Sequence, residues 1–92
     1  MTCEIEYTEQ FVSAFKKLSQ QQQKRLTETV KKLSTDPDHP GLRRHKFKGL
    51  RDCWTIRSGR SDRLVILQIH QTRFRLLDVG PHDAVYRRLN RS

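Results

Sequence analysis

An uninterrupted apolar run, Leu64-Val65-Ile66-Leu67, most constrains what this 92-residue chain can fold into. Four apolar side chains in succession, between polar segments, are typical of a strand that is covered on both faces. A strand of this kind lies in the middle of a sheet, where a neighbouring strand pairs with each edge and other elements cover each face. We therefore expect a central strand over residues 63–70, within a layered fold built around a sheet.

Three further segments complete the expected sheet. Residues 3–7 alternate between apolar and acidic side chains, which predicts a short strand with one buried face. Residues 53–57 and 74–79 predict two more strands, joined to the central strand by short polar turns. Residues 38–51 contain a Pro-Gly pair and a later glycine, so this segment is expected to be a loop.

Two helices are expected between the first and second strands. Apolar residues recur at helical spacing from Phe11 to Leu18, and Thr8 precedes them as an N-cap. Ser19 followed by Gln22 resembles a capping box, which predicts the start of a second helix. Asp36-Pro37 ends that helix, because the residue before a proline disfavours helical geometry. The two helices are expected to form a hairpin.

The expected architecture is α+β, with strands and helices in the order β-α-α-β-β-β. The helical hairpin packs on one face of a mostly antiparallel four-stranded sheet and leaves the other face free for function. Gly80-Pro81 ends the last strand, with room for a short C-terminal helix over residues 82–89. The length fits a single domain, residues 1–92, and the sequence shows no internal repeat or linker.

The chain carries a net charge of +9, and the excess of cations is confined to one part of it. Residues 1–38 contain six Lys/Arg and six Asp/Glu, whereas residues 39–92 contain thirteen Lys/Arg and four Asp/Glu. A one-sided basic surface is typical of proteins that bind a polyanion. We therefore favour nucleic acid or the ribosome as a partner. A membrane surface is disfavoured, because no segment pairs a basic face with a strong apolar face.

Two cysteines, Cys3 and Cys53, are too few for a disulfide framework and have no metal-binding spacing. We expect both to be small buried side chains in a reducing compartment. The sequence has no signal peptide, transmembrane run or lipidation motif. It predicts a soluble protein of the cytoplasm that uses no metal and no cofactor.

No motif of fixed spacing identifies an enzyme class, since a glycine-rich phosphate loop, a zinc pattern and a nucleophile elbow are all absent from the sequence. The expected strands instead carry arginines that can gather over one face of the sheet. Guanidinium groups bind phosphate oxygens in pairs, so such a face would suit a phosphate backbone. The arginines concerned are Arg57, Arg63, Arg73 and Arg75.

Four segments in this basic part resemble RelE-type toxins. Residues 50–57, Leu-Arg-Asp-Cys-Trp-Thr-Ile-Arg, resemble the family's loop and the aromatic strand that follows it. Arg63-Leu64-Val65 resembles the next strand. Asp78-Val79-Gly80 and Val85-Tyr86-Arg87-Arg88 resemble the pattern at the end of the family's chains.

The resemblance spans roughly residues 42–88, and the order of the expected elements extends it to the whole chain. The sequence departs from the family pattern at Gly80-Pro81-His82, where the histidine stands one position later and a proline intervenes. It also has Thr55 where some relatives have a lysine.

RelE-type toxins are the toxic partners in bacterial toxin–antitoxin operons, and active members cut messenger RNA in the ribosomal A site. The resemblance implies an endoribonuclease in which the 2′-hydroxyl of the messenger attacks the adjacent phosphate without a metal ion. That reaction needs a base for the hydroxyl, positive charge for the phosphorane and an acid for the leaving oxygen. The family positions carried over to this chain are Arg57, Arg63 and Tyr86. His82 lies two residues past Gly80, where the family often has an arginine, and it completes the expected catalytic set.

The resemblance also implies a surface for RNA and the ribosome. In relatives the basic loop before the second strand faces RNA, and the turn and the C-terminal segment of this chain add further cations. The residues expected on this surface are His45, Lys46, Lys48, Arg60, Arg87 and Arg88, with Arg91 in the same basic tail.

Several of these residues also have purely structural interpretations. Arg63 could be a solvated charge at a strand end, and Tyr86 could be a core residue that anchors the last helix. Trp54 is more often a half-buried core residue than a stacking platform for a base. Arginine stays protonated, so the proton shuttle of a nuclease would be His82, His45 or Tyr86.

Three functions remain open from the sequence. The first is the ribosome-dependent mRNA endonuclease, the second a ParE-like toxin that inhibits gyrase without catalysis, and the third a catalytically inactive RelE-like regulatory module. The first two imply a small acidic antitoxin that covers the basic face. Its complex would weaken as salt concentration rises.

Overall fold

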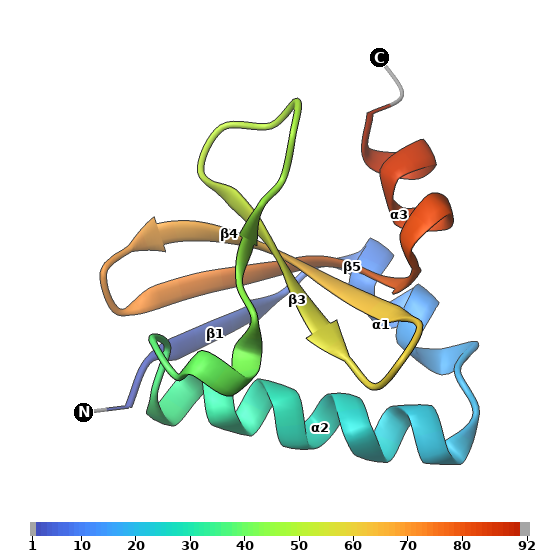
Figure 1. Ribbon diagram of the computed structural model, residues 1–92, viewed down its shortest axis with the longest axis horizontal. Coiled ribbons are helices and arrows are strands. Elements are labelled where there is room, and N and C mark those ends of the chain that lie inside the picture. The colour runs from blue at the N-terminus through green and yellow to red at the C-terminus, as the bar shows by residue number, and fades with distance from the viewer. Residues whose placement is uncertain (1, 91–92) are drawn as a thin grey trace.

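Five strands form one mixed sheet in the order β1-β5-β4-β3-β2 (Figure 1). The structure is a computed structural model that describes residues 2–90. Its strands are β1 (Glu4–Tyr7), β2 (His45–Lys46), β3 (Cys53–Ser58), β4 (Asp62–His70) and β5 (Arg73–Pro81). β1 pairs in parallel with β5, and the other three pairs are antiparallel. The predicted α+β class with a mostly antiparallel sheet is confirmed.

The fifth strand, β2, lies in the segment that was expected to be a loop. It pairs two residues with β3, His45 with Thr55 and Lys46 with Trp54. The same segment also contains η1, a 3-10 turn over Pro40–Leu42. The prediction of a four-stranded sheet was therefore one strand short, because a two-residue strand is too brief to show an alternating pattern.

Three helices accompany the sheet: α1 (Glu9–Lys16), α2 (Gln20–Thr35) and α3 (His82–Leu89). The predicted caps are present. The hydroxyl of Thr8 accepts a hydrogen bond from the Phe11 amide, and Ser19 and Gln22 form both bonds of a capping box. The third helix confirms the C-terminal helix for which the sequence left room.

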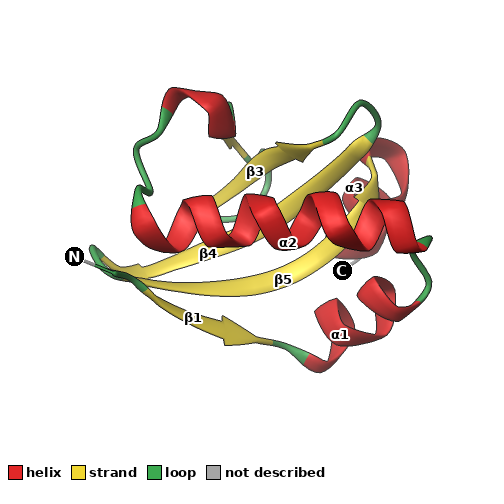
Figure 2. Ribbon diagram, turned by 90° about the horizontal axis from the view of Figure 1, so that it is seen from below, coloured by secondary structure: helices red, strands yellow, loops and turns green. Residues whose placement is uncertain are grey.

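The helices cover the two faces of the sheet unequally (Figure 2). α1 and α2 pack on one face and enclose the larger core cluster, which includes Leu64 and Ile66 of β4. Val65, between them, points to the opposite face and packs with Phe47, Cys53 and Val85. The apolar run of β4 is thus covered on both sides, as its sequence predicts.

The face opposite α1 and α2, here called the α3 face, is less open than expected. Val85 of α3 and Phe47 of the β2–β3 loop are both buried against it. In Figure 1, α2 lies below the strands and α3 stands above the end of β5. The expectation that this face is wholly free was wrong, because the chain folds its last helix back over the end of the sheet.

The two cysteines are free thiols with different environments. Cys53 is buried, and burial raises the pKa of its thiol above the ordinary value even though the nearby Lys46 charge lowers it. Cys3 is only half-buried. Within residues 2–90 no helix is long and apolar enough to cross a membrane.

Candidate functional site

Two arginines of the α3 face lie directly opposite each other. Arg57 of β3 pairs with Arg63 of β4, and Arg63 in turn pairs with Gly80 of β5. Both arginines alternate with Ile56 and Leu64 of the larger core cluster, so their positions face away from α1 and α2. Like charges directly opposite each other destabilise a sheet. An anion bound between Arg57 and Arg63 would therefore reduce their repulsion.

Neither guanidinium of this pair has an acidic partner within residues 2–90. Arg63 makes one long contact of 3.4 Å from Nη1 to the carbonyl oxygen of Asp62, and Arg57 makes no side-chain hydrogen bond there. Arg57 is exposed and Arg63 is half-buried. Their bidentate donors remain available to phosphate oxygens.

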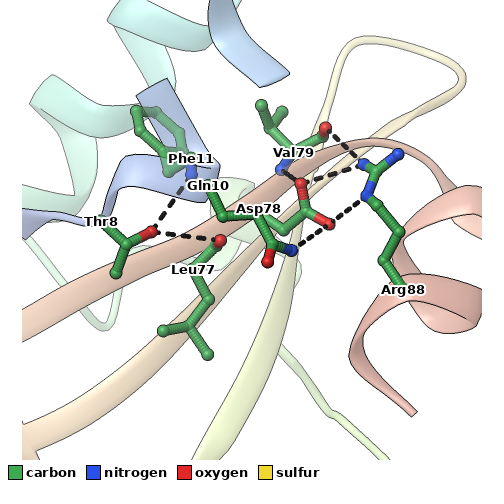
Figure 3. A network of polar contacts seen from close by, with 7 residues as sticks. All are labelled: Thr8, Gln10, Phe11, Leu77, Asp78, Val79 and Arg88. Atoms are coloured by element: carbon green, nitrogen blue, oxygen red, sulfur yellow. Dashed lines mark hydrogen bonds and ion pairs between the residues drawn. The ribbon is translucent and has the colours of Figure 1, made fainter. Parts of the chain in front are cut away.

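α3 is fixed beside this pair by a buried ion pair (Figure 3). The Asp78 side chain on β5 is 0% exposed, and Arg88 of α3 donates to it twice, Nε to Oδ2 at 2.7 Å and Nη2 to Oδ1 at 2.9 Å. Arg88 also donates to the carbonyl oxygen of Val79 at 3.2 Å. Hydrogen bonding to Asp78 raises the pKa of the Arg88 guanidinium above its ordinary value. The charge of Arg88 thus holds the helix on the sheet.

The same carboxylate connects α3 to α1. Gln10 of α1 donates to Asp78 Oδ2 at 3.2 Å, and the Val79 amide donates to Asp78 Oδ1 at 2.8 Å. Thr8, the cap of α1, donates its hydroxyl to the carbonyl oxygen of Leu76 at 2.8 Å. Figure 3 shows the contacts of Asp78 and a second bond of the Thr8 hydroxyl, to the carbonyl oxygen of Leu77 at 3.3 Å. β5 therefore positions α1 and α3 through one continuous polar network.

Tyr86 is held between two rings at the inner side of α3. The centroid of its ring lies 4.3 Å from that of Phe47, in a stacked arrangement, and 4.4 Å from that of His82. Aromatic pairs at such separations are stabilising. Tyr86 fits both interpretations, that of a core residue and that of a site residue. Its ring packs against the smaller core cluster, and it also contacts the imidazole of His82.

His82 is the first residue of α3, and its side chain is 56% exposed. Its Nδ1 lies 3.4 Å from Asp83 Oδ1, at the limit of a hydrogen bond. His82 follows Gly80 by two residues, and Gly80 is the partner of Arg63. Sheet register thus places His82 two residues beyond the partner of Arg63, and the ring contact places Tyr86 beside His82.

The residues expected to bind RNA are dispersed around the end of the α3 face that holds Arg57 and Arg63. Lys48, Arg60 and Arg87 are exposed, and none of them has an ion pair within residues 2–90. His45 is exposed on β2, opposite Thr55. Arg88, by contrast, is engaged with Asp78, and Arg91 lies outside the described residues.

Lys46 lies on the other face of the sheet from His45. It is opposite Trp54, and its ammonium nitrogen lies 5.1 Å from the centre of that ring. The Arg44 guanidinium lies 4.7 Å from the same ring. Trp54 is half-buried against the larger core cluster, so the structural interpretation of this residue is confirmed.

Arg73 and Arg75 share the α3 face with Arg57 and Arg63, because they alternate with Phe74 and Leu76 of the larger core cluster, but they do not gather with that pair. They lie at the other end of β5, where β1 places an acidic residue beside each of them. Arg73 Nη2 is 2.9 Å from Glu4 Oε2, and Arg75 Nη2 is 3.1 Å from Glu6 Oε1. Their charges are neutralised within the sheet.

The residue that sequence reasoning missed is Asp78. In the sequence it is visible only as part of the family pattern Asp78-Val79-Gly80. The available signal was an acidic side chain inside an otherwise apolar strand, which needs a cationic partner if it is buried. The register that brings Arg88 to it was not readable from spacing alone.

Comparison with known proteins supports this geometry at the level of the fold. YafQ from E. coli strain BL21(DE3) has a TM-score of 0.74 at 18% identity, over 91% of this chain and 98% of YafQ. A mutant of E. coli toxin RelE in the free state has a TM-score of 0.70 at 20% identity, over 91% of this chain and 87% of RelE. The toxin–antitoxin complex RelBE2 from Mycobacterium tuberculosis gives 0.71 at 20% identity, over 89% of this chain and 100% of the matched chain.

The chain has the RelE-like toxin fold. The resemblance seen in residues 42–88 is thereby confirmed for the fold, which extends over nearly the whole chain. No protein-family model matches the sequence, and no curated protein matches it. At about 20% identity the likeness reaches the arrangement of the elements, and the chemistry has to be argued from the residues of this chain.

Proposed function

We propose that this protein is the toxin of a bacterial toxin–antitoxin pair and that it cleaves messenger RNA on the ribosome. The observation that carries the proposal is the cross-strand pair of Arg57 and Arg63, which has no acidic partner within residues 2–90. Gly80, the β5 partner of Arg63, stands two residues before His82, whose ring contacts that of Tyr86. The solved structures with this fold include the RelBE and DinJ–YafQ toxin–antitoxin complexes.

The chemistry follows from the roles these groups can take. The 2′-oxygen forms a bond to the adjacent phosphorus and its proton passes to a base. The bond from phosphorus to the 5′-oxygen breaks, and that oxygen takes a proton from an acid, which leaves a 2′,3′-cyclic phosphate and a 5′-hydroxyl. Arg57 and Arg63 stabilise the charge that develops on the phosphate oxygens. His82 is the preferred proton carrier because imidazole exchanges protons near neutral pH, and Tyr86 holds its ring in place.

The ribosome supplies what the isolated site lacks. His82 is exposed, and its nearest acidic neighbour, Asp83, is itself almost fully exposed. A site this open positions neither the messenger nor the imidazole tightly, and correct positioning alone can account for a large part of a catalytic barrier. Held in the A site, the messenger would reach the arginine pair in a fixed conformation. The proposed place of action is therefore the cytoplasm.

The proposed antitoxin is a small acidic protein. The exposed cations of the α3 end are complementary to such a partner, and the solved structures with this fold include toxin–antitoxin complexes. The affinity of the pair should fall as salt concentration rises. A complex whose affinity did not change with salt would contradict a contact through the basic face.

A cell-free translation reaction with primer extension on the messenger tests the proposed activity. The wild-type protein should cut within the ribosomal A site, and only when ribosomes are present. His82→Ala should slow cutting by about 100- to 10,000-fold, the usual contribution of a general acid or base. Tyr86→Phe keeps the ring stack and removes only the hydroxyl, so it separates a chemical role of Tyr86 from a packing role.

His70→Ala is the matched control, because His70 is an exposed histidine at the far end of β4. It should leave cutting unchanged. An intact messenger and normal protein synthesis with the wild-type protein would refute the nuclease. A gyrase supercoiling assay would then distinguish a ParE-like toxin from an inactive binding module.

A further inference from the structure

A second basic site lies between α2 and the edge of β3. It is a cleft of about 270 Å³, here called the α2–β3 cleft, and it is separate from the stack of Tyr86 and His82. Its walls come from α2, from the end of η1 and from the β3–β4 turn. Its cations are Arg25, Lys32, Arg43 and Arg57, and its carboxylate is Glu28.

Four cations and one carboxylate line this cleft. None of the four cationic side chains makes an ion pair or a side-chain hydrogen bond within residues 2–90, whereas Arg44, Arg73, Arg75 and Arg88 all have acidic partners there. One carboxylate, Glu28, balances only part of this positive charge, so the cations repel one another, and an anion in the cleft would reduce that cost. The cleft therefore has the charge of an anion-binding site.

The spacing of its cations exceeds the reach of a single small anion. Arg25 and Lys32 are seven residues apart on α2, which puts them about 10 Å apart along the same side of the helix. Gly59 has a φ of 73°, and a Cβ built on it would lie 2.7 Å from Arg25 Nη1. The glycine thus lets Arg25 lie against the turn at one end of the cleft. An extended chain of anions fits this row better than one phosphate.

The lining favours a nucleic-acid backbone over a protein segment. Among the described residues 2–90, none with an apolar side chain lines the α2–β3 cleft. A protein partner usually needs an apolar centre in its interface, whereas phosphate contacts need only cations and amides. The groove between α1 and α2 shows the contrast, since its walls are mostly apolar; they include Phe11, Val12, Phe15, Leu26 and Val30.

Arg57 links this cleft to the candidate catalytic end. Its position in the sheet belongs to the α3 face, where it is the cross-strand partner of Arg63. At the edge of β3 it also lines the α2–β3 cleft. We propose that the α2–β3 cleft binds the phosphate backbone of RNA that continues from the candidate site over the edge of β3. The proposal rests on the proposed function only in taking RNA as the polyanion.

Binding of a short 2′-O-methyl RNA, which has no 2′-hydroxyl and is not cleaved, tests the cleft. The measurement is fluorescence anisotropy at several salt concentrations. The variant Arg25→Gln/Lys32→Gln removes two cleft cations. The matched control Lys24→Gln/Lys31→Gln removes two cations from the same helix at the same spacing, and neither of them lines the cleft.

The cleft variant should bind more weakly than the control, and its plot of log affinity against log salt should be less steep by about 1.4, which is about 0.7 for each lost phosphate contact. Equal losses in both variants would show a diffuse charge effect and overturn the inference. A polyglutamate peptide that loses more affinity than the RNA in the cleft variant would also overturn it, in favour of an acidic protein partner.

The same variants in the translation assay separate this inference from the nuclease proposal. If the cleft variant binds RNA more weakly than the control while the wild-type protein leaves messengers intact, the cleft stands and the nuclease fails. If the wild-type protein cuts messengers and the two variants bind RNA and cut equally well, the nuclease stands and the cleft inference is wrong.

Discussion

The two ends of the α3 face use the same residue type in opposite ways. At the end formed by β1 and the start of β5, Arg73 and Arg75 are paired with Glu4 and Glu6. At the other end, Arg57 and Arg63 face each other with no acid between them. At the first end, here called the closed end, the glutamates neutralise the arginine charges, and the ion pairs link β1 to β5. The second end can bind an anion.

Strand register accounts for this difference. β1 runs parallel to β5 with Glu4 opposite Arg73 and Glu6 opposite Arg75, so each arginine meets a carboxylate. β4 runs antiparallel to β3 and β5, and its register gives Arg63 an arginine on one side and a glycine on the other. Counting arginines on strands therefore overestimates a phosphate-binding surface. The partner of each arginine decides whether its charge is available.

The largest expected effect is on cleavage by Arg63→Ala. If Arg63 stabilises the phosphorane, the cleavage rate should fall by about 100- to 1000-fold, as when one preorganised donor is removed from a transition-state site. Arg75→Ala makes the same substitution on the same face at the closed end and should leave the rate unchanged. Primer extension on ribosome-bound messenger measures both. If both variants lost the same factor in cleavage rate, the two ends of the α3 face would not differ in function.

The next effect is on folding, through Arg88→Ala. Removing Arg88 leaves the buried Asp78 carboxylate without its cation, so the free energy of unfolding should fall by about 2–3 kcal/mol. The loss should stay below the roughly 3–5 kcal/mol of fully buried pairs, because the Arg88 side chain is 43% exposed and solvent screens it.

Urea unfolding measures this loss, with Arg87→Ala as the matched control on the adjacent position. That control should change stability by no more than about 0.5 kcal/mol. Adding Asp78→Asn to Arg88→Ala should recover part of the loss, since the buried charge is then gone. If Arg88→Ala unfolds at the wild-type urea concentration, α3 is not anchored by this pair.

The smallest effect comes from opening the closed end. Glu4→Gln/Glu6→Gln removes the partners of Arg73 and Arg75, and because both ion pairs are exposed the cost in stability should be about 1 kcal/mol or less. The released guanidiniums should then strengthen RNA binding and steepen its salt dependence, without raising the cleavage rate. Anisotropy with the uncleavable RNA detects the change. An unchanged salt dependence would mean that the ion pairs with Glu4 and Glu6 do not prevent Arg73 and Arg75 from binding RNA.

Much of the fold was predictable because its cues are local. The apolar run of β4 predicted a strand covered on both faces, and Thr8 and Ser19 predicted the starts of α1 and α2. The candidate site was predictable only as a set of residues, through the resemblance. Its organisation depends on which residues meet across the sheet, and the chain gives no local cue for the contact of Arg88 with Asp78 or of Tyr86 with Phe47.

Arg88 illustrates the limit most directly. It stands next to Arg87 in a short basic segment, and the sequence offers the same interpretation for both. The structure separates them, because one turns toward a buried carboxylate and the other remains exposed without an ion pair in the described residues. Adjacent residues of a helix point in different directions, so the roles of Arg87 and Arg88 can be told apart only when the element that packs against each side of α3 is known.

The parallel pairing of β1 with β5 joins Glu4 to Arg73, residues that are sixty-nine positions apart. Closing so long a loop is entropically costly, and folds rich in distant pairings assemble slowly. During synthesis, β1 leaves the ribosome as an edge without a neighbour, and its two glutamates protect it from pairing with other chains. α3 follows β5 in the chain, so His82 and Tyr86 reach Arg57 and Arg63 only after the sheet can close. While a ribosome is still adding the residues before 82, the nascent chain therefore lacks part of its candidate site.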